Sequence, residues 1–207
     1  GEANVGRSEQ YEDLFPALIT DWRRQWRSDF PFYFVQLANF MESKEIQPDS
    51  EWAALREAQT KALKLDQVGM VVTIDIGLAD DIHPKNKQEV GRRLALVALA
   101  GSYGKNVSSS APVFQNYIIK GNKMELDFGQ KQDGFQIKGT TLKGFTIAGP
   151  DRVFYPAEAM VHDGKIILSS TEVPAPLAAR YGWADNPDCN LYGENGLPVA
   201  PFRTDCW

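Results

Sequence analysis

The sequence contains few of the residues that bind metal ions in proteins. Among 207 residues there are two histidines, His83 and His162, and two cysteines, Cys189 and Cys206. The histidines lie far apart and no Cys-X-X-Cys pair occurs, so the ligand spacing of zinc sites is missing. The two cysteines, close to the C-terminal end, can form one disulfide or remain as thiols. The sequence therefore predicts no metal site and leaves the redox compartment open.

Long hydrophobic runs and an excess of positive charge are also missing. No apolar stretch approaches the roughly 20 residues that a membrane-spanning helix needs. A net charge of −5 and a pI near 5.1 argue against a nucleic-acid partner or an anionic membrane partner. Hydrophobic residues make up 43% of the chain, enough for one large domain or two small ones. The chain opens at Gly1-Glu2 without a methionine or an export signal, and we expect it to come from the interior of a longer protein.

The first half of the chain alternates between helical and strand patterns. Helical spacing of apolar residues covers 8–27, 50–65 and 85–101, and the apolar runs at 31–38 and 68–75 are typical of buried strands. This alternation predicts βα units around a parallel sheet. The first helix carries apolar residues roughly on one face: Tyr11, Leu14, Phe15, Leu18, Trp22 and Trp26.

A different pattern begins after a polar, linker-like stretch at 105–112. Short segments with alternating polar and apolar residues predict strands at 113–119, 123–128, 135–137, 145–147, 153–155, 158–162 and 165–169. Dipeptides that favour hairpin turns stand at Gly121-Asn122, Asp133-Gly134 and Asp163-Gly164. This half of the chain therefore predicts a small antiparallel β domain, similar to a sandwich.

Two domains follow from this change of pattern, an α/β domain at 1–106 and an antiparallel β domain at 107–207. The tail from Arg180 onward is rich in Gly, Pro and Asn, and we expect little regular structure there. Arg180, Tyr181 and Trp183 in this tail have two interpretations. They either contact a sugar or pack within the protein.

The segment Asp80-Asp81-Ile82-His83-Pro84 places carboxylates beside an imidazole, between a predicted strand and a predicted helix. Pro84 suits the first position of that helix. In several α/β hydrolases a carboxylate three residues before a histidine holds the imidazole in the correct tautomer, while the other ring nitrogen faces a serine. The alternative is that Asp80 and Asp81 only cap the helix, with an exposed histidine beside them.

Several sequence blocks, which together span nearly the whole chain, carry a more specific signal. They are GEAN at residues 1–4, YEDLFPALITDWRRQW, PFYFVQLANF, VTIDIG…DDIHPKNKQEVGRRLA and the ending RYGWADNP…NLYGENGLPVAPFRTD. In this order they resemble the sialate O-acetylesterase family of carbohydrate esterases, which are relatives of the SGNH hydrolases. The resemblance implies an α/β fold with an SGNH or flavodoxin-like parallel-sheet hydrolase domain, of which residues 1–106 are the C-terminal part.

The resemblance also implies roles for particular residues. His83 corresponds to the family's catalytic base, and the spacing points to Asp80 as its orienting carboxylate, with Asp81 as the alternative. Gly1, Glu2 and Asn4 match a block that reads Gln-Gly-Glu in the family. They would lie at the edge of the active site, where a backbone N–H helps to bind the oxyanion. No metal or organic cofactor is implied.

The family's nucleophile is a serine in a Gly-Gln-Ser-Asn-like block, and no such block occurs in this sequence. Ser8, Ser102 and the serines at 108–110 lack the strand-to-helix setting of a nucleophile elbow. We therefore expect the serine to lie outside this chain and the chain alone to be inactive. The N-terminal fragment of the same protein is then a candidate partner.

For the complete protein the resemblance implies a serine-type acetylesterase that removes acetyl groups from hydroxyls of sialic acid or a related sugar. Two alternatives stay open: an esterase that acts on acetylated plant polysaccharide such as acetyl-xylan, and a non-catalytic carbohydrate-binding fragment. Because relatives that act on glycans are usually exported or lysosomal, the family also implies an extracytoplasmic location.

Overall fold

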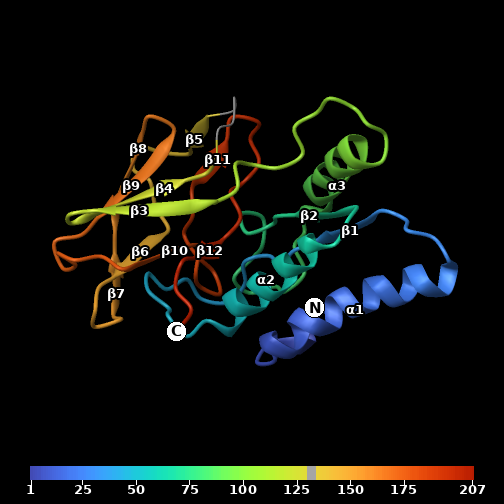
Figure 1. Ribbon diagram of the computed structural model, residues 1–207, viewed down its shortest axis with the longest axis horizontal. Helices are drawn as coiled ribbons and strands as arrows, with labels where there is room; N and C mark the ends of the chain where they lie inside the picture. Colours follow the sequence, from blue (N-terminus) through green and yellow to red (C-terminus); the bar gives the residue numbers. More distant parts are fainter. Residues whose placement is uncertain (130–133) are drawn as a thin grey trace. The chain divides into compact units, whose positions relative to one another are not determined.

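The computed structural model describes residues 1–129 and 134–207, and Figure 1 shows its helices and strands. By its internal contacts the chain divides into two compact units. The first unit consists of Gly1–Met41 and Glu51–Ser109, and the second of Glu42–Ser50 and Ser110–Trp207. The division predicted at 106/107 places residues 42–50 in the first domain, whereas the structure groups them with the second unit.

The first unit contains one pair of parallel strands, β1 (Phe32–Val35) and β2 (Val68–Val71). Its helices are α1 (Ser8–Trp26), α2 (Glu51–Lys61) and α3 (Lys87–Gly101), with short 3₁₀ turns η1 (Glu2–Asn4) and η2 (Ala62–Lys64). The mixed α/β class predicted from the sequence is confirmed. The larger parallel sheet of a complete SGNH-like hydrolase stays a prediction.

Alternate residues of β1 face helices on opposite sides of the strand pair. Phe34 is buried in a cluster with Ile19 of α1 and Ala62 of η2. Tyr33 points the other way, and its hydroxyl lies 2.6 Å from the hydroxyl of Ser102 at the end of α3. Figure 1 correspondingly shows α1 and α2 on one side of the strands and α3 on the other. Both faces of the parallel pair are thus covered by helices, as βα units require.

α1 buries only some of the apolar residues that the sequence places on one face. Tyr11 and Ile19 are buried, and the Phe15 ring contacts the rings of Tyr11 and Phe34. Four other residues of this apolar face are exposed and recur every fourth residue: Leu14 (55% exposed), Leu18 (41%), Trp22 (45%) and Trp26 (69%). We call these four residues the α1 stripe. The predicted helix is confirmed, but only part of its apolar face is buried, because α1 turns one narrow face toward α2 and β1.

β2 and α3 differ from the predicted elements at their ends. β2 ends at Val71 rather than at residue 75, and α3 begins at Lys87, so Pro84 is not the first helical residue. The reason lies at Asn86, whose side-chain oxygen accepts a hydrogen bond from the Glu89 N–H at 3.1 Å and caps the helix. The interpretation of Asp80 and Asp81 as caps of this helix is therefore wrong.

The second unit is built from antiparallel strands. One four-stranded sheet contains, in spatial order, β3 (Asn116–Lys120), β4 (Lys123–Asp127), β9 (Lys165–Ser169) and β8 (Glu158–His162). The other contains β12 (Phe202–Arg203), β10 (Ala178–Tyr181), β6 (Phe145–Ala148) and β7 (Phe154–Pro156), while β11 (Leu191–Gly193) pairs with β5 (Phe135–Ile137). The antiparallel character is confirmed, and the sandwich arrangement stays a prediction.

Two of the three predicted turns lie where strands of the second unit meet. Gly121-Asn122 joins β3 to β4, and Asp163-Gly164 joins β8 to β9. The turn predicted at Asp133-Gly134 includes Asp133, which lies outside the described residues. The side chains that β4 and β9 direct inward are fully buried: Met124, Leu126, Ile166 and Leu168.

The tail of the chain forms strands that the sequence did not predict. β10 pairs with β6 and β12, and β11 pairs with β5, so each strand has a partner many residues away. Strand formation there depends on these distant partners, and the Gly- and Pro-rich composition gives little local signal for it.

Arg180 and Tyr181 in this tail pack within the protein. Tyr181 has no exposed surface. The Arg180 guanidinium donates hydrogen bonds to both carboxylate oxygens of Asp205, at 2.9 and 2.6 Å, and to the Pro48 carbonyl at 2.8 Å. It also lies over the Phe154 ring, 4.0 Å from its centre. For these two residues the packing interpretation is correct and the sugar contact is wrong.

Candidate active site

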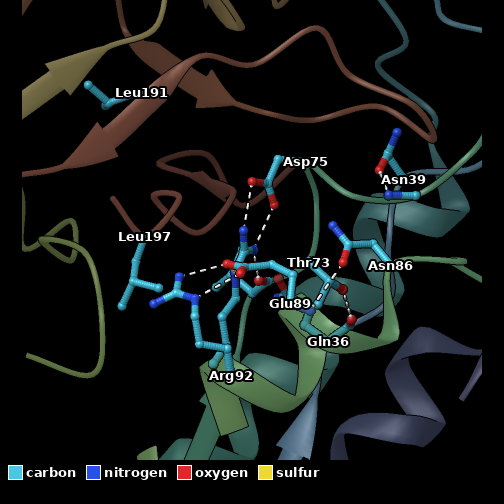
Figure 2. Close-up of polar contacts among 12 residues, drawn as sticks. Gln36, Asn39, Thr73, Asp75, Asn86, Glu89, Arg92, Leu191 and Leu197 are labelled. Atoms are coloured by element: carbon cyan, nitrogen blue, oxygen red, sulfur yellow. Dashed lines mark hydrogen bonds and ion pairs between the residues drawn. The ribbon is translucent and has the colours of Figure 1, made fainter. Parts of the chain in front are cut away.

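The loops that follow β1 and β2 meet at one edge of the parallel pair, as Figure 2 shows. The Thr73 hydroxyl donates a hydrogen bond to the Gln36 carbonyl at 2.6 Å, and the Gly77 N–H donates to the Asn39 side-chain oxygen at 2.6 Å. The Met41 N–H donates to the carbonyl of residue 79 at 3.0 Å. This is the carboxyl edge of the strands, where α/β proteins place their ligand sites.

α2 holds the loop after β1 through three side chains. The Trp52 indole N–H and the Arg56 guanidinium both donate to the Ala38 carbonyl, at 2.8 and 2.9 Å. Arg56 also donates to the Leu37 carbonyl at 2.9 Å, and the Gln59 side-chain oxygen accepts from the Leu37 N–H at 2.9 Å. Arg56 is fully buried, so its hydrogen bonds are not shared with bulk water. The loop is therefore a fixed support for whatever contacts it.

Gly77 is where the two loops approach most closely. A Cβ atom on Gly77 would lie 2.0 Å from the Asn39 backbone oxygen, a distance that real atoms do not reach. We expect Gly77→Ala to destabilise the protein by about 2 kcal/mol or more, since backbone must move in at least one loop. Gly91→Ala is the matched control, because nothing lies within 4 Å of its Cβ position in α3. That variant should be about 0.5–1 kcal/mol more stable than the wild type. Equal effects of the two changes in urea unfolding would contradict the close approach.

An ion-pair network joins the start of α3 to the segment after β2. The buried Arg93 guanidinium donates to both Asp75 carboxylate oxygens, at 2.7 and 2.9 Å, and to the Val72 carbonyl at 2.7 Å. Arg93 and Arg92 both donate to the Glu89 carboxylate, at 2.8 and 2.7 Å, and Figure 2 shows these contacts. The hydrogen bonds from Arg92, followed by those from Arg93, lower the pKa of Glu89 to about 2. The network thereby fixes both ends of the segment that carries Asp80 to His83.

The lowered pKa of Glu89 predicts how stability responds to acid. The ionised form stabilises the fold fully above the usual pKa of about 4.5, and this contribution is lost as the pH falls from about 4.5 to about 2. Because water screens the partly exposed pair, we expect Glu89→Gln to lower the free energy of unfolding by about 1–2 kcal/mol at pH 7. This loss of unfolding free energy should become smaller as the pH approaches 2. Urea unfolding measured across this pH range tests the prediction. Glu9→Gln, which changes an acidic residue in the first turn of α1, is the control. An equal loss at pH 2 and pH 7 would contradict the role of the Glu89 charge.

His83 lies in the loop between Gly77 and the Asn86 cap of α3, and its side chain is 80% exposed. Its Nδ1 atom is 3.7 Å from Asp81 Oδ1, and its backbone N–H donates to the same oxygen at 2.9 Å. Asp80 is exposed and makes no hydrogen bond or ion pair with the described residues. The structure therefore brings Asp81 beside the imidazole, on the Nδ1 side, and leaves Nε2 open. Which of the two carboxylates orients the ring during catalysis stays a prediction.

The N-terminal residues lie against the same edge of the strand pair. Glu2–Asn4 form η1, in which the Asn4 backbone N–H and side-chain amide both donate to the Gly1 carbonyl, at 2.9 and 3.3 Å. A Cβ atom on Gly1 would lie 3.4 Å from the Leu37 side chain, directly after β1. Gly1, Glu2 and Asn4 thus stand next to the loop that contacts Gly77. Their part in binding an oxyanion stays a prediction.

Known proteins share this arrangement of elements. The sialate O-acetylesterase of Mus musculus is 29% identical over 98% of this chain and 42% of its own length. That of Pongo abelii is 30% identical over 98% of this chain and 44% of its own length. The crystal structure of a carbohydrate acetylesterase from Xanthomonas citri covers 100% of this chain and 49% of that one, with a TM-score of 0.93 and 44% identity. Over nearly its whole length the chain is similar in sequence to the sialate O-acetylesterases. No family model matches it.

The chain spans less than half the length of the curated relatives that it matches. Ser102, at the far end of α3, is not placed to serve His83. Ser102 terminates α3, and the helix rises 1.5 Å per residue, so Ser102 is about 24 Å from the Asn86 cap beside the His83 loop. The Ser102 hydroxyl bonds to that of Tyr33 instead, and Ser8 begins α1. That the nucleophile for His83 lies outside this chain stays a prediction.

Other features bear on the predictions made from composition. Cys189 and Cys206 are not joined by a disulfide, and His162 is exposed beside Asp163. Within residues 1–129 and 134–207, no three side chains of His, Cys, Asp or Glu gather in a way that would hold a metal ion. No helix in the same described ranges is long and apolar enough to cross a membrane.

Proposed function

We propose that the chain is the base-carrying half of a serine-type carbohydrate acetylesterase. The observation that carries the proposal is the Asp81–His83 contact at the carboxyl edge of β1 and β2, in a chain similar in sequence to acetylesterases over nearly its whole length. The loop is held at its start, where Asn39 binds Gly77 and Arg93 binds Asp75, and at its end, where Asn86 caps α3. A base on a supported loop can meet a nucleophile in a defined geometry.

The proposed reaction is a double displacement at the acetyl carbonyl. A serine outside this chain attacks the carbonyl carbon while His83 Nε2 accepts its proton, and Asp80 or Asp81 stabilises the imidazolium. The backbone of Gly1 to Asn4 helps to bind the oxyanion. When the C–O bond to the sugar breaks, His83 returns the proton to the departing sugar oxygen. His83 then activates a water molecule, which releases acetate and restores the serine. The proposal needs no metal or organic cofactor, since an ester is reactive toward an activated hydroxyl.

The α1 stripe supports a partner segment. Leu14, Leu18, Trp22 and Trp26 present two leucines and two indoles to solvent along one helix, and monomeric proteins rarely leave such a surface uncovered. The curated relatives have more than half of their length outside the region that matches this chain. We propose that the N-terminal fragment of the same protein, carrying the serine, covers this stripe and completes the active site.

The proposed substrate is an O-acetylated carbohydrate. Identity to a sialate O-acetylesterase is 29–30%, and identity to the Xanthomonas citri carbohydrate acetylesterase is 44%. The second protein is named only as a carbohydrate acetylesterase, so acetylated plant polysaccharide of the acetyl-xylan kind stays the second candidate beside O-acetyl sialic acid. An extracytoplasmic location follows from a glycan substrate and is proposed on that ground alone.

The assay that tests this function compares the 207-residue chain with the longer protein that includes a serine-bearing N-terminal segment. On p-nitrophenyl acetate we expect turnover by the longer protein and none above background by the chain alone. O-acetyl sialic acid and acetyl-xylan, assayed in parallel for released acetate, then separate the two substrate candidates. Undiminished turnover by the chain alone would contradict the proposal that the nucleophile lies elsewhere. A longer protein without any acetylesterase activity would favour the carbohydrate-binding alternative.

A further inference from the structure

A hollow of about 440 Å³ lies in the second unit, and no role has yet been given to it. Its floor includes the buried Phe145 and the half-buried Trp183, and its rim carries Lys44, Glu45, Lys143 and Asp188. The volume falls within the range of small-molecule sites and is sufficient for one or two sugar rings. All of these residues belong to the same unit, so the hollow does not depend on the placement of the other unit.

One wall of the hollow is fixed by hydrogen bonds. The segment 42–50, which carries Lys44 and Glu45, is held through Gln47, which exchanges hydrogen bonds with the side chain and backbone of Asp185. Ser50 donates to the same Asp185 carboxylate at 2.6 Å. The Trp183 indole N–H donates to the Pro48 carbonyl at 3.1 Å. A site whose wall is already ordered loses little conformational entropy when a ligand binds.

The charges on the rim indicate what the hollow can bind. Lys143 and Asp188 form an exposed ion pair at 2.7 Å, and Lys44 and Glu45 add one charge of each sign. The rim is therefore balanced in charge and offers both donors and acceptors. Sugar hydroxyls also donate and accept, whereas an anionic ligand would need an excess of cations. The Phe145 ring is 4% exposed and packs against Tyr181 and Phe202, so the half-buried Trp183 is the aromatic side chain in the lining that can meet the C–H face of a sugar ring.

We propose that this hollow binds a neutral sugar unit, as a second carbohydrate site separate from the His83 loop. The choice of a glycan rests on the proposed function, but the site and its charge balance rest on the geometry of the second unit.

The test is isothermal titration of the 207-residue chain with xylohexaose, cellohexaose and mannohexaose, beside 3′-sialyllactose as a charged probe. We expect saturable binding of at least one neutral hexasaccharide. Lys44→Ala/Glu45→Ala, which removes two hydrogen-bonding groups from the rim, should weaken that binding about tenfold or more. Lys123→Ala/Glu172→Ala is the matched control, since it removes one exposed charge of each sign outside the hollow and should leave binding unchanged.

The outcomes separate this inference from the proposed function. Three outcomes would each overturn the proposed sugar site. They are binding of 3′-sialyllactose alone, the absence of saturable binding of any probe, and binding of a neutral hexasaccharide that Lys44→Ala/Glu45→Ala does not weaken. Hydrolysis of p-nitrophenyl acetate by the longer protein is measured independently. If the longer protein shows no such hydrolysis but the chain binds a hexasaccharide, the proposed esterase function is refuted and the proposed sugar site is still supported.

Discussion

Replacing His83 by Ala in the longer, active protein should lower kcat/KM for p-nitrophenyl acetate by about 10³-fold or more. The imidazole is the proposed acceptor of the serine proton, and a hydroxyl is a poor nucleophile at neutral pH when its base is removed. Because His83 is 80% exposed and makes only local contacts, the variant should keep the thermal stability of the wild type. A fall in activity therefore reports on chemistry rather than on folding.

The chain offers a matched control for this experiment. His162 is also exposed and also lies near a carboxylate, with Nε2 at 3.3 Å from Asp163, but it belongs to β8 in the second unit. His162→Ala should retain full activity. Comparison of Asp80→Asn with Asp81→Asn then identifies the orienting carboxylate, and the contact in the structure predicts the larger loss for Asp81→Asn. Equal activity of His83→Ala and wild type would rule out His83 as the base.

Removing one partner of the Arg180–Asp205 pair should give the largest loss of stability in the second unit. Both side chains are almost completely buried, and Arg180→Ala leaves the Asp205 carboxylate in the protein interior without its two strongest hydrogen-bond donors. An uncompensated buried charge costs about 3–5 kcal/mol. Arg203 Nη1, 3.6 Å from the Asp205 carboxylate, still compensates part of the charge, so we expect the free energy of unfolding in urea to fall by an amount at the lower end of this range. The loss should exceed that of any single exposed ion pair.

Lys143→Ala provides the comparison, because it breaks an ion pair of similar length that is exposed at both ends. That change should cost at most about 1 kcal/mol. The double change Arg180→Met/Asp205→Leu removes both charges together and should recover part of the loss caused by Arg180→Ala. If Arg180→Ala and Lys143→Ala cost the same, burial does not govern the strength of the Arg180 pair.

The sequence was most informative where apolar residues recur with a regular period. The spacing of Val90, Leu94 and Val97 located α3 to within two residues, and alternation located β4, β8 and β9. The start of α3 was misplaced because Pro84 suggested a first helical position, while the Asn86 side chain supplies the cap. The cap depends on a single side-chain hydrogen bond, and the periodicity of apolar residues does not predict it.

Features that depend on distant partners could not be predicted. β10, β11 and β12 form only through pairing with other strands, so their Gly- and Pro-rich surroundings suggested an irregular tail. The exposed Trp22 and Trp26 resemble core residues in sequence, because hydrophobicity does not reveal which apolar side finds a partner within the chain. The Asn39–Gly77 and Arg93–Asp75 contacts of the candidate site likewise join residues 38 and 18 positions apart. The sequence located the His83 loop but not the groups that hold it.

The assignment of residues 42–50 to the second unit has a consequence for how the protein is made. On the ribosome these residues emerge more than 130 positions before Arg180 and Asp185, which bind Pro48, Gln47 and Ser50. The segment must therefore wait without its partners until nearly the whole chain has been synthesised, and closing so long a loop slows folding. A fragment that begins at residue 107 lacks this segment permanently. An expression strategy for the second unit should therefore supply residues 42–50, by co-expression or by circular permutation.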